Sequence, residues 1–252
     1  MVTVENLTVS YRQHPALHHI SGRFVDGSLT AVIGPNGSGK STLLKSIMGL
    51  LRPAGGRVQV NTPRTRIAYM PQLTEIDRTF PMSVQDCVQL GCWAASGAWG
   101  RVTPALRQRV ANAITEVGLT GFEQRSVGSL SSGQLQRVLF ARLMVQDADL
   151  ILLDEPFNAM DSRTTDALLV LVHRWHTEGR TVVAVLHDDE QVRAHFAQTV
   201  LLARELVAWG NTGTVLTAPN LQRARALAEA WDDHADICHT DELPSLPKRE
   251  AV

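Results

Sequence analysis

The apolar and polar positions near the start of the chain predict two strands, a glycine turn and a helix. Residues 2–9 approximately alternate between apolar and polar side chains, as a half-buried strand does, and Arg23–Val25 is the expected antiparallel partner. Leu29–Ile33 is a short, largely β-branched run that ends at Gly34, and helical composition follows over Lys40–Leu51. The pattern therefore predicts an antiparallel edge sheet, followed by a strand, a glycine turn and a helix.

The central part of the chain has a helical pattern, and strands return after it. Residues 82–146 contain few β-branched runs long enough for a strand, which predicts an inserted helical subdomain. Leu150–Leu153 and Thr181–Leu186 are apolar strand patterns separated by a predicted helix over Thr164–Glu178. This alternation of strand, helix and strand is typical of a parallel sheet.

The C-terminal part adds a strand pair and a helix. Val200–Ala203 and Leu206–Trp209 have the pattern of a closing hairpin or edge pair, and a helix is expected near Leu221–Trp231. Residues 232–252 are first acidic and then contain prolines, which is typical of a loose tail.

Composition and charge exclude several classes of protein. Of the 252 residues, 44% are apolar and 19% are charged, which is enough for one large or two small domains and excludes disorder as the main state. The 24 basic and 25 acidic residues give a formal charge of −1, so the chain has no excess positive field for a nucleic acid backbone. We therefore expect no nucleic acid partner.

The apolar segments and the cysteines bear on location. Every apolar run is far shorter than the roughly 20 residues of a membrane helix, and the N-terminus lacks the basic and apolar blocks of a secretory signal. Cys87, Cys92 and Cys238 are an odd number of cysteines without clear spacing, which suits free thiols in a reducing compartment. These features predict a chain that stays in the cytosol.

The glycine-rich segment between the predicted strand and helix carries a phosphate-binding pattern. It reads glycine, four residues, then Gly-Lys-Ser, which is the spacing of a P-loop. The glycines let backbone N–H groups converge on phosphate oxygens, Lys40 brings charge to the β and γ phosphates, and Ser41 offers a hydroxyl to Mg²⁺. A glycine-rich turn with an accidental lysine is the alternative. The residues assigned to nucleotide binding are Gly34, Pro35, Asn36, Gly37, Ser38, Gly39, Lys40, Ser41 and Thr42.

Two carboxylates follow the later apolar strand. Asp154 and Glu155 stand at the carboxyl end of Leu150–Leu153, the edge at which an open α/β sheet presents its ligands. We expect Asp154 to hold Mg²⁺, directly or through water, and Glu155 to polarise the attacking water as a general base. An ordinary strand end capped by acids is the alternative.

The segment Leu130-Ser131-Ser132-Gly133-Gln134 resembles the signature sequence of ATP-binding cassette (ABC) proteins, which usually reads Leu-Ser-Gly-Gly-Gln. The order of P-loop, signature and acidic strand end is also that of the family. The resemblance implies an α/β fold: an ABC-type P-loop NTPase domain over residues 1–231, with an N-terminal antiparallel β subdomain and the helical subdomain at about 82–146, followed by the tail. It assigns Ser131, Ser132, Gly133 and Gln134 to nucleotide binding.

Four further positions resemble single family residues. Gln72 resembles the Q-loop glutamine, which senses Mg²⁺ and joins the helical subdomain to the core, and His187 resembles the switch histidine at the γ phosphate. Residues 158–161, with Asp161 as the acid, resemble the D-loop. Tyr11 resembles the aromatic residue that stacks on adenine. Taken singly, Tyr11 also fits a core residue, Gln72 a polar loop residue and His187 a strand-end histidine.

Two departures from the family pattern affect the expected rate. Ser132 replaces the first signature glycine, and Asn158 with Met160 replaces the commoner Ser-Ala-Leu-Asp wording of the D-loop. A serine still exposes its backbone N–H, so the phosphate contact survives provided that this position does not need a positive φ.

The resemblance also implies partners. ABC cassettes pack head to tail so that the signature of one completes the nucleotide site of the other, and a chain with one P-loop and one signature is expected to act as a homodimer. Separate integral membrane permease subunits are implied, docking near Gln72. The expected location is the cytoplasmic face of the cell inner membrane, as a peripheral subunit.

The segment after Gln72 bears on the cargo. Ile76-Asp77-x-x-Phe80-Pro81-x-Ser83-Val84, followed by Leu90-Gly91, resembles the ATPases of zinc and manganese importers, which work with an extracytoplasmic substrate-binding protein. The sequence therefore predicts the ATP-hydrolysing subunit of a transition-metal importer, with zinc as the first expectation. Generic packing shared with siderophore or haem importers is one alternative, and a soluble ABC protein without a transport role is another.

Histidines and a cysteine raise a separate metal question. His14, His18 and His19 are expected in a loop before the core strands. The tail carries donors that suit zinc, namely His234, Cys238, His239 and Asp241. Their spacing matches no standard zinc module, so a solvated tail is the favoured interpretation and a regulatory zinc site remains a hypothesis.

Overall fold

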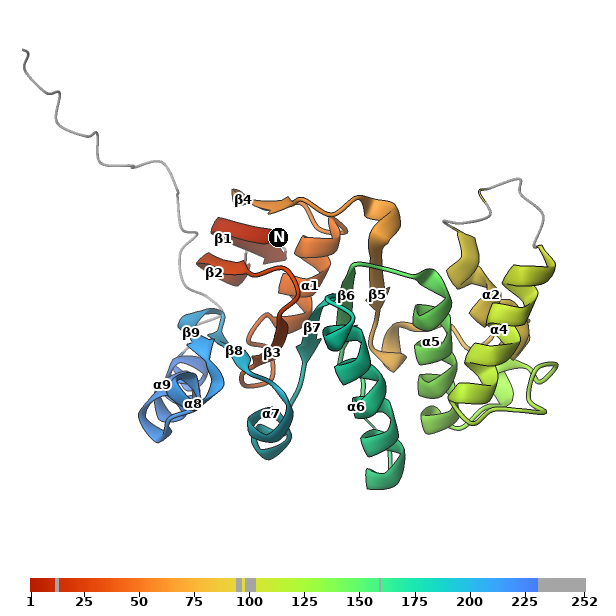
Figure 1. Ribbon diagram of the computed structural model, residues 1–252. Helices are drawn as coiled ribbons and strands as arrows, with labels where there is room; N and C mark the ends of the chain where they lie inside the picture. The colour runs from red at the N-terminus through yellow and green to blue at the C-terminus, as the bar shows by residue number, and fades with distance from the viewer. Residues whose placement is uncertain (12–13, 94–96, 98–102, 159, 231–252) are drawn as a thin grey trace, which may run out of the picture.

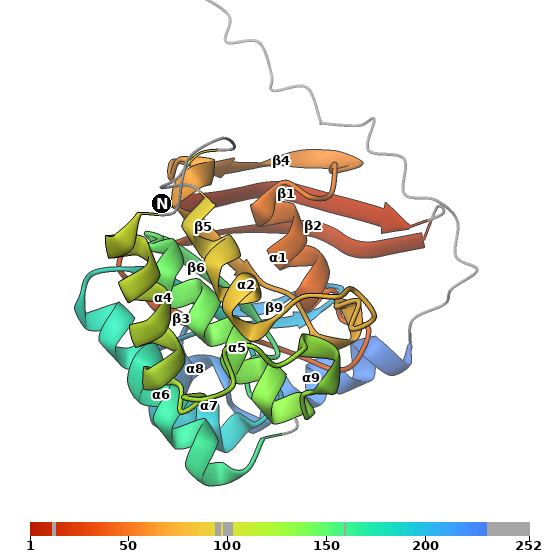
Figure 2. The same cartoon turned by 90° about the vertical axis from the view of Figure 1, so that its right-hand side faces the viewer.

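Two β-sheets form the centre of the molecule, one above the other (Figures 1 and 2). The computed structural model describes residues 1–11, 14–93, 97, 103–158 and 160–230. The smaller sheet is antiparallel, in the order β2-β1-β4. Its strands are β1 (Val2–Tyr11), β2 (His14–Phe24) and β4 (Gly55–Val60).

The larger sheet has the order β5-β6-β7-β3-β8-β9. Neighbouring strands from β5 to β8 pair in parallel, and β9 closes the edge by pairing antiparallel to β8. The strands are β3 (Leu29–Ile33), β5 (Ile67–Met70), β6 (Leu150–Asp154), β7 (Thr181–Val185), β8 (Gln198–Ala203) and β9 (Glu205–Asn211). This arrangement confirms the predicted parallel sheet and the closing strand pair.

The described helices lie around the larger sheet, with α2, α4 and α5 grouped on one side (Figures 1 and 2). They are α1 (Lys40–Met48), α2 (Val84–Gln89), α4 (Pro104–Glu116), α5 (Ser132–Gln146), α6 (Ser162–Thr177), α7 (Asp189–His195), α8 (Thr212–Val215) and α9 (Ala218–Glu229). Short 3-10 turns in the described residues lie between these helices and strands, at Arg64–Arg66, Leu73–Glu75, Leu90–Cys92 and Val127–Ser129.

The parallel strands are buried on both faces, which explains their continuous apolar sequences. On β6, Ile151 and Leu153 belong to the core under α5 and α6, whereas Leu150 and Leu152 belong to the core shared with α1 and the smaller sheet. Because successive side chains of a strand point to opposite faces, one strand serves both cores. The sheet is thereby held between two apolar layers.

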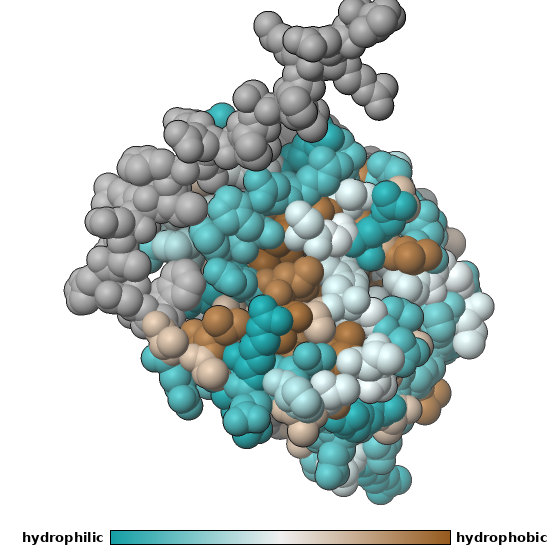
Figure 3. All heavy atoms as spheres, turned by 90° about the vertical axis from the view of Figure 1, so that its left-hand side faces the viewer, coloured by the Kyte–Doolittle hydropathy of each residue, from teal (hydrophilic) through white to brown (hydrophobic). Residues whose placement is uncertain are grey.

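Strand β9 joins the two sheets. The Trp209 ring lies against the Phe24 ring, with ring centroids 4.6 Å apart, and a Cβ at Gly22 would lie 2.2 Å from the Trp209 ring. The side of the molecule that carries β9 and α9 shows apolar atoms in its middle and polar atoms around them (Figure 3). Glycine at position 22 therefore makes room for the tryptophan that covers the small sheet.

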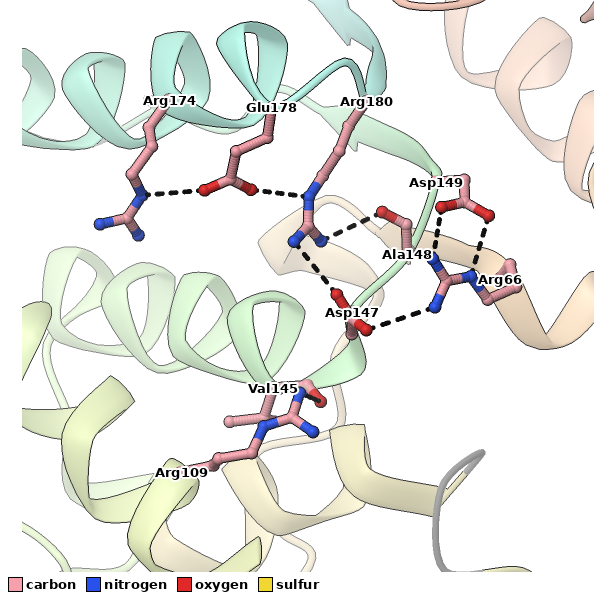
Figure 4. A network of polar contacts seen from close by, with 9 residues as sticks. All are labelled: Arg66, Arg109, Val145, Asp147, Ala148, Asp149, Arg174, Glu178 and Arg180. Carbon is pink, nitrogen blue, oxygen red and sulfur yellow. Dashed lines mark hydrogen bonds and ion pairs between the residues drawn. The ribbon is translucent and has the colours of Figure 1, made fainter.

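Ion pairs connect the amino ends of β5, β6 and β7 (Figure 4), whereas Asp154 stands at the carboxyl end of β6. Arg66, before β5, pairs with Asp147 and Asp149 ahead of β6, and Arg180, ahead of β7, pairs with Asp147 and Glu178. Exposed ion pairs contribute little singly, but here they form a connected network. The network therefore links the amino ends of three neighbouring strands, whereas the glycine-rich loop follows the carboxyl end of β3.

Several boundaries and elements differ from the predictions. Helix α1 ends at Met48 because Gly49 adopts φ 75° and caps it, whereas the sequence predicted helix to Leu51. Strands β4 and β5 and helix α7 were not predicted, because short, partly polar segments carry weak periodicity.

The early histidines lie in a strand, which corrects the predicted loop. His14, His18 and His19 are all part of β2, and β1 pairs with β2 from Val2 opposite Phe24 to Tyr11 opposite His14. His19 adopts φ 52° at an irregularity in this pairing. Irregular pairing hides the alternation on which the sequence prediction depended. None of the helices in the described residues combines the length and apolar character needed to span a membrane.

Candidate nucleotide site

The loop between β3 and α1 has a backbone that only glycine permits at two points. Gly34 has φ 150°, and a Cβ there would lie 2.0 Å from the carbonyl oxygen of Leu202. Gly39 has φ 90°, and a Cβ there would lie 2.4 Å from the carbonyl oxygen of Ala16. Both positions require glycine for conformation and for space. The loop can therefore turn tightly at the N-terminus of α1, where backbone N–H groups suit an anion.

Lys40 is buried inside this loop. Its Nζ donates to the carbonyl oxygens of Gly34 and Pro35, each at 2.9 Å. Burial lowers the pKa of Lys40, while the nearby carboxylates of Glu155 and Asp154 act in the opposite direction. The Lys40 ammonium group thus lies within the glycine-rich loop, and both carboxylates are close enough to favour its charged form.

A cavity of about 300 Å³ lies over the loop and joins distant parts of the sequence. Tyr11, at the end of β1, is 48% exposed and lines this cavity rather than the core. Its other predicted members are Asn36, Gly37, Ser38, Gly39, Lys40, Ser41, Thr42, Gln72 and Glu155. Pro35 and Gly34 line a neighbouring cavity together with His187.

Ser41, Gln72 and Asp154 meet at one point. The Ser41 hydroxyl donates to Oδ1 of Asp154 at 3.0 Å, and Nε2 of Gln72 donates to Oγ of Ser41 at 3.0 Å. Asp154 is fully buried, and burial raises its pKa, although the hydrogen bonds from Ser41 and Gln72 oppose that rise. A divalent cation would favour the ionised carboxylate, and hydroxyl, carboxylate and amide oxygens are ligands that Mg²⁺ prefers. The residues present therefore fit Mg²⁺, which the Asp154 carboxylate, the Ser41 hydroxyl and the Gln72 amide would hold.

Glu155 is held by three donors. Its Oε1 accepts from Nε2 of Gln72 at 2.9 Å and lies 2.7 Å from Nε2 of His187, while its Oε2 accepts from Nδ2 of Asn158. Glu155 also adopts φ 52°, a conformation that a residue with a side chain rarely takes. Such backbone strain is typical of functional positions. The structure thus brings the predicted base and the predicted switch histidine into direct contact.

The signature segment forms the N-terminus of α5, outside this cavity. Ser131 and Gln134 make a reciprocal capping box, in which Ser131 Oγ accepts from the Gln134 N–H and Gln134 Oε1 accepts from the Ser131 N–H. Ser132 and Gly133 are the first residues of the helix, so their N–H groups have no acceptor within it. Neither they nor Asp161 line the cavity over the loop.

Asp161 caps α6. Its carboxylate accepts from the backbone N–H and the hydroxyl of Thr164, both at 2.9 Å, and these hydrogen bonds lower its pKa. Within one chain, the structure brings together the loop, Tyr11, Gln72, Asp154, Glu155 and His187, and leaves the signature segment and Asp161 apart from them.

Two residues that hold Glu155 were not assigned to the site from the sequence. Gln136, on α5, is fully buried, and its Nε2 donates to the carbonyl oxygens of Glu155 at 3.2 Å and Pro156 at 2.6 Å. A glutamine among buried apolar residues of a helix was the available signal, because a buried amide needs a partner. Asn158 was named as part of the D-loop segment and as a departure from its usual wording, but its contact with Glu155, which depends on the local turn, was not predicted.

Two of the β2 histidines, His18 and His19, have side-chain partners other than a metal. Nδ1 of His18 lies 3.3 Å from Glu205, and Nδ1 of His19 lies 2.7 Å from Oδ1 of Asn6. In the described ranges, no group of three or more His, Cys, Asp or Glu side chains is arranged to hold a metal ion. The tail donors His234, Cys238, His239 and Asp241 lie outside the described residues.

Comparison with known proteins places this geometry in a family. A family model described as ABC transporter matches residues 17–158. The chain is 41% identical over 228 residues to the zinc transport system ATP-binding protein TroB of Treponema pallidum, covering 88% of this chain and 86% of that protein. The chain belongs to the ABC transporter family. It is accordingly an ATP-binding transport ATPase that hydrolyses ATP.

Other members of the family show similar likeness. The chain is 39% identical over 226 residues to the manganese transport system ATP-binding protein MntB of Listeria monocytogenes, covering 88% of this chain and 94% of that one. Among solved structures, a metal-chelate type ABC transporter in an inward-facing conformation matches with TM-score 0.78 and 32% identity, covering 89% of this chain and 88% of that one. A dimeric bacterial ABC transporter cassette bound to ADP and Pi in a post-hydrolysis state matches with TM-score 0.76 and 26% identity, covering 84% and 99%. The ABC-type α/β fold expected from the sequence is confirmed.

Proposed function

We propose that this chain is the ATP-hydrolysing subunit of an ABC importer for a divalent transition metal, with zinc as the expected cargo. The observation that carries the metal assignment is the 41% identity to a zinc transport ATP-binding protein across 88% of the chain. Manganese transport relatives at 39% identity support a transition metal as the class of cargo. The nucleotide site supports the ATP chemistry independently of the cargo.

Each site residue has a role in this proposal. Tyr11 stacks on adenine, the glycine-rich loop and Lys40 bind the phosphates, and Ser41, Gln72 and Asp154 hold Mg²⁺, which neutralises phosphate charge when bound. Glu155 accepts the proton of the attacking water as a general base. His187, at 2.7 Å from Glu155, orients that carboxylate and contacts the γ phosphate.

The separation of the signature from the loop supports a head-to-tail homodimer. In such a dimer, Ser131, Ser132, Gly133 and Gln134 of one chain lie against the nucleotide that its partner binds. The N–H groups of Ser132 and Gly133, which lack acceptors within α5, then meet the γ phosphate. Asp161 belongs to the same contact surface. A dimeric solved cassette at 26% identity supports this arrangement.

An exposed apolar groove supports docking of membrane permease subunits. Leu90 and Trp93 are exposed and line a cavity of about 440 Å³ beside α5, and Phe80 is exposed in the segment before α2. Exposed clustered apolar side chains mark interaction sites. The proposal therefore places integral membrane permeases at this groove. As parts of an importer of this class, it also includes an extracytoplasmic substrate-binding protein and a peripheral position of this chain at the cytoplasmic face of the inner membrane.

The test is the metal content of cells that lack the gene, grown under zinc limitation and under manganese limitation. Cells complemented with the chain and cells complemented with Lys40→Ala serve as matched controls. We expect a zinc deficit that the chain repairs and Lys40→Ala does not. A deficit of manganese alone would replace zinc with manganese, and unchanged content of both metals would overturn the cargo assignment.

A second candidate cargo is a metal chelate. The metal-chelate type transporter at 32% identity and TM-score 0.78 favours it. The same strains distinguish the two cargoes when iron is supplied only as a siderophore or as haem. Loss of growth on the chelate, with normal zinc and manganese, would favour the chelate.

A further inference from the structure

The short segment between β5 and α2 touches two different parts of the nucleotide machinery. At its start, Gln72 donates to Glu155 at 2.9 Å. Further along, a terminal guanidinium nitrogen of Arg78 donates to Oγ of Ser132 at 3.2 Å, on the first residue of α5. Ser132 is also the residue that departs from the usual signature glycine. The contact therefore involves a hydroxyl that the common signature wording lacks.

The backbone around Arg78 is held in place. The Asp77 carboxylate accepts from the N–H of Thr79 at 2.8 Å and from its hydroxyl at 2.6 Å, which fixes the turn that presents Arg78. A Cβ at Gly128 would lie 2.6 Å from the carbonyl oxygen of Arg78, so this backbone packs directly against the residues before the signature. Arg78 thus contacts the signature region through both its backbone and its side chain.

The positively charged guanidinium of Arg78 lies beside the N-terminus of α5. A helix N-terminus carries partial positive charge, and a cation beside it is unfavourable unless an anion is also bound there. The capping box already occupies the N–H groups of Ser131 and Gln134. The N–H groups of Ser132 and Gly133 are therefore left for an anion such as the γ phosphate of the partner's ATP, and Arg78 holds the Ser132 hydroxyl beside them.

Helix α5 also reaches the catalytic carboxylate of its own chain. Gln136 lies about one turn after Ser132, and its buried amide donates to the carbonyl oxygens of Glu155 and Pro156. Contacts therefore link the start of α5 to Glu155 through Gln136, and to Gln72 through the segment that carries Arg78. This set of contacts connects the signature end and the catalytic end of one chain.

On the basis of the proposed two-site dimer, we propose that Arg78 is a positioning residue that couples the two ATP sites through its hydrogen bond to Ser132. Ser132 faces the nucleotide of the partner, whereas Gln72 and Glu155 face the nucleotide of their own chain. ATP at one site then orders Ser132 and Arg78, and this order is passed to the other site. The coupling appears as positive cooperativity in ATP.

The test is the ATPase rate of the full chain as a function of ATP concentration, for Arg78→Ala, Ser132→Ala and the double variant. For each single variant we expect the Hill coefficient to fall toward 1. The half-saturating ATP concentration should rise by about 5-fold or more, because coupling between two sites usually changes affinity by at least about that factor. The double variant should match the single variants, because both remove the same contact.

Two further variants keep the test decisive. Arg78→Lys retains a hydrogen-bond donor and should keep part of the cooperativity. Arg125→Ala is the matched control: it removes an exposed arginine of the same helical region, which stacks on Phe122, and should leave the cooperativity unchanged. Thermal unfolding identifies any variant that fails to fold. If Arg78→Ala fails in this way, the Ser132→Ala and Arg78→Lys curves decide.

The inference and the proposed function fail in different ways. Cooperativity that survives Arg78→Ala, additive effects in the double variant, or a wild-type chain with a Hill coefficient of 1 would each overturn the coupling by Arg78 and leave the ATPase in place. A wild-type chain that does not hydrolyse ATP would instead overturn the proposed function, together with the inference built on it.

Discussion

The imidazole Nε2 of His187 lies 2.7 Å from Oε1 of Glu155, although the two residues are 32 positions apart in the sequence. Glu155 follows β6 and His187 follows β7, and these strands are neighbours in the parallel sheet. Because the carboxyl ends of parallel strands share one edge, two residues that each follow a strand become partners. The pairing gives the proposed base an orienting group.

Replacing Glu155 separates ATP binding from turnover. For Glu155→Gln we expect ATP binding to persist and hydrolysis to fall by about 10²-fold or more, because an amide cannot accept the proton of water. The closed dimer should accumulate with ATP, as measured by gel filtration beside a steady-state ATPase assay. Hydrolysis at the parental rate would remove Glu155 from its assigned role.

Tyr11 should bind the base through its ring. Tyr11→Ala is expected to weaken ATP binding by about 1 kcal/mol, or roughly 5-fold in Kd, through lost aromatic stacking. Tyr11→Phe keeps the ring and should bind like the parent in the same nucleotide titration. If Tyr11→Ala and Tyr11→Phe bind equally well, the stacking role is wrong.

Gln136 should stabilise both the fold and the catalytic turn. In Gln136→Leu, the carbonyl oxygens of Glu155 and Pro156 lose their buried donor, at an expected cost of about 1–3 kcal/mol in the free energy of unfolding. Urea unfolding measures this cost, and kcat should fall as well because the strained Glu155 backbone is less constrained. Gln108→Leu, on the exposed side of α4, is the matched control. Equal stability and kcat in the two variants would refute the role.

The lowered pKa of His173 predicts how the free energy of unfolding changes with pH. Its Nε2 lies 3.1 Å from Nδ1 of His195, and burial lowers its pKa from 6.5, with His195 and His176 adding to the effect. The unfolded chain therefore binds more protons below about pH 6.5, so the free energy of unfolding falls as pH drops through that value.

His173→Gln should flatten this dependence. Urea unfolding between about pH 8 and pH 5.5 is the measurement, because the window brackets the unfolded pKa of histidine. His14→Gln, which changes an exposed residue of β2, should keep the parental slope. An unchanged slope in His173→Gln would show that other groups determine the pH dependence.

Much of the site follows from local sequence, but its contacts do not. The spacing from Gly34 to Ser41 and the acids after Leu153 identify a nucleotide site without any coordinates. The same sequence misplaced His18 and His19 in a loop, because an irregular strand pairing broke the expected alternation. It also left Gln136 unassigned, since a single polar residue in a helix has no local pattern to identify its partner.

The chemistry of each segment can be read from the sequence: the glycine turn, the buried apolar strands and the acidic strand end. Glycine conformation and hydrophobic periodicity are local properties, so a few neighbouring residues carry them. Which segments meet, such as Gln72 with Glu155 and Arg78 with Ser132, depends on the tertiary structure. Those contacts join residues far apart in the chain, and their geometry depends on strand order and helix packing, which no single segment encodes.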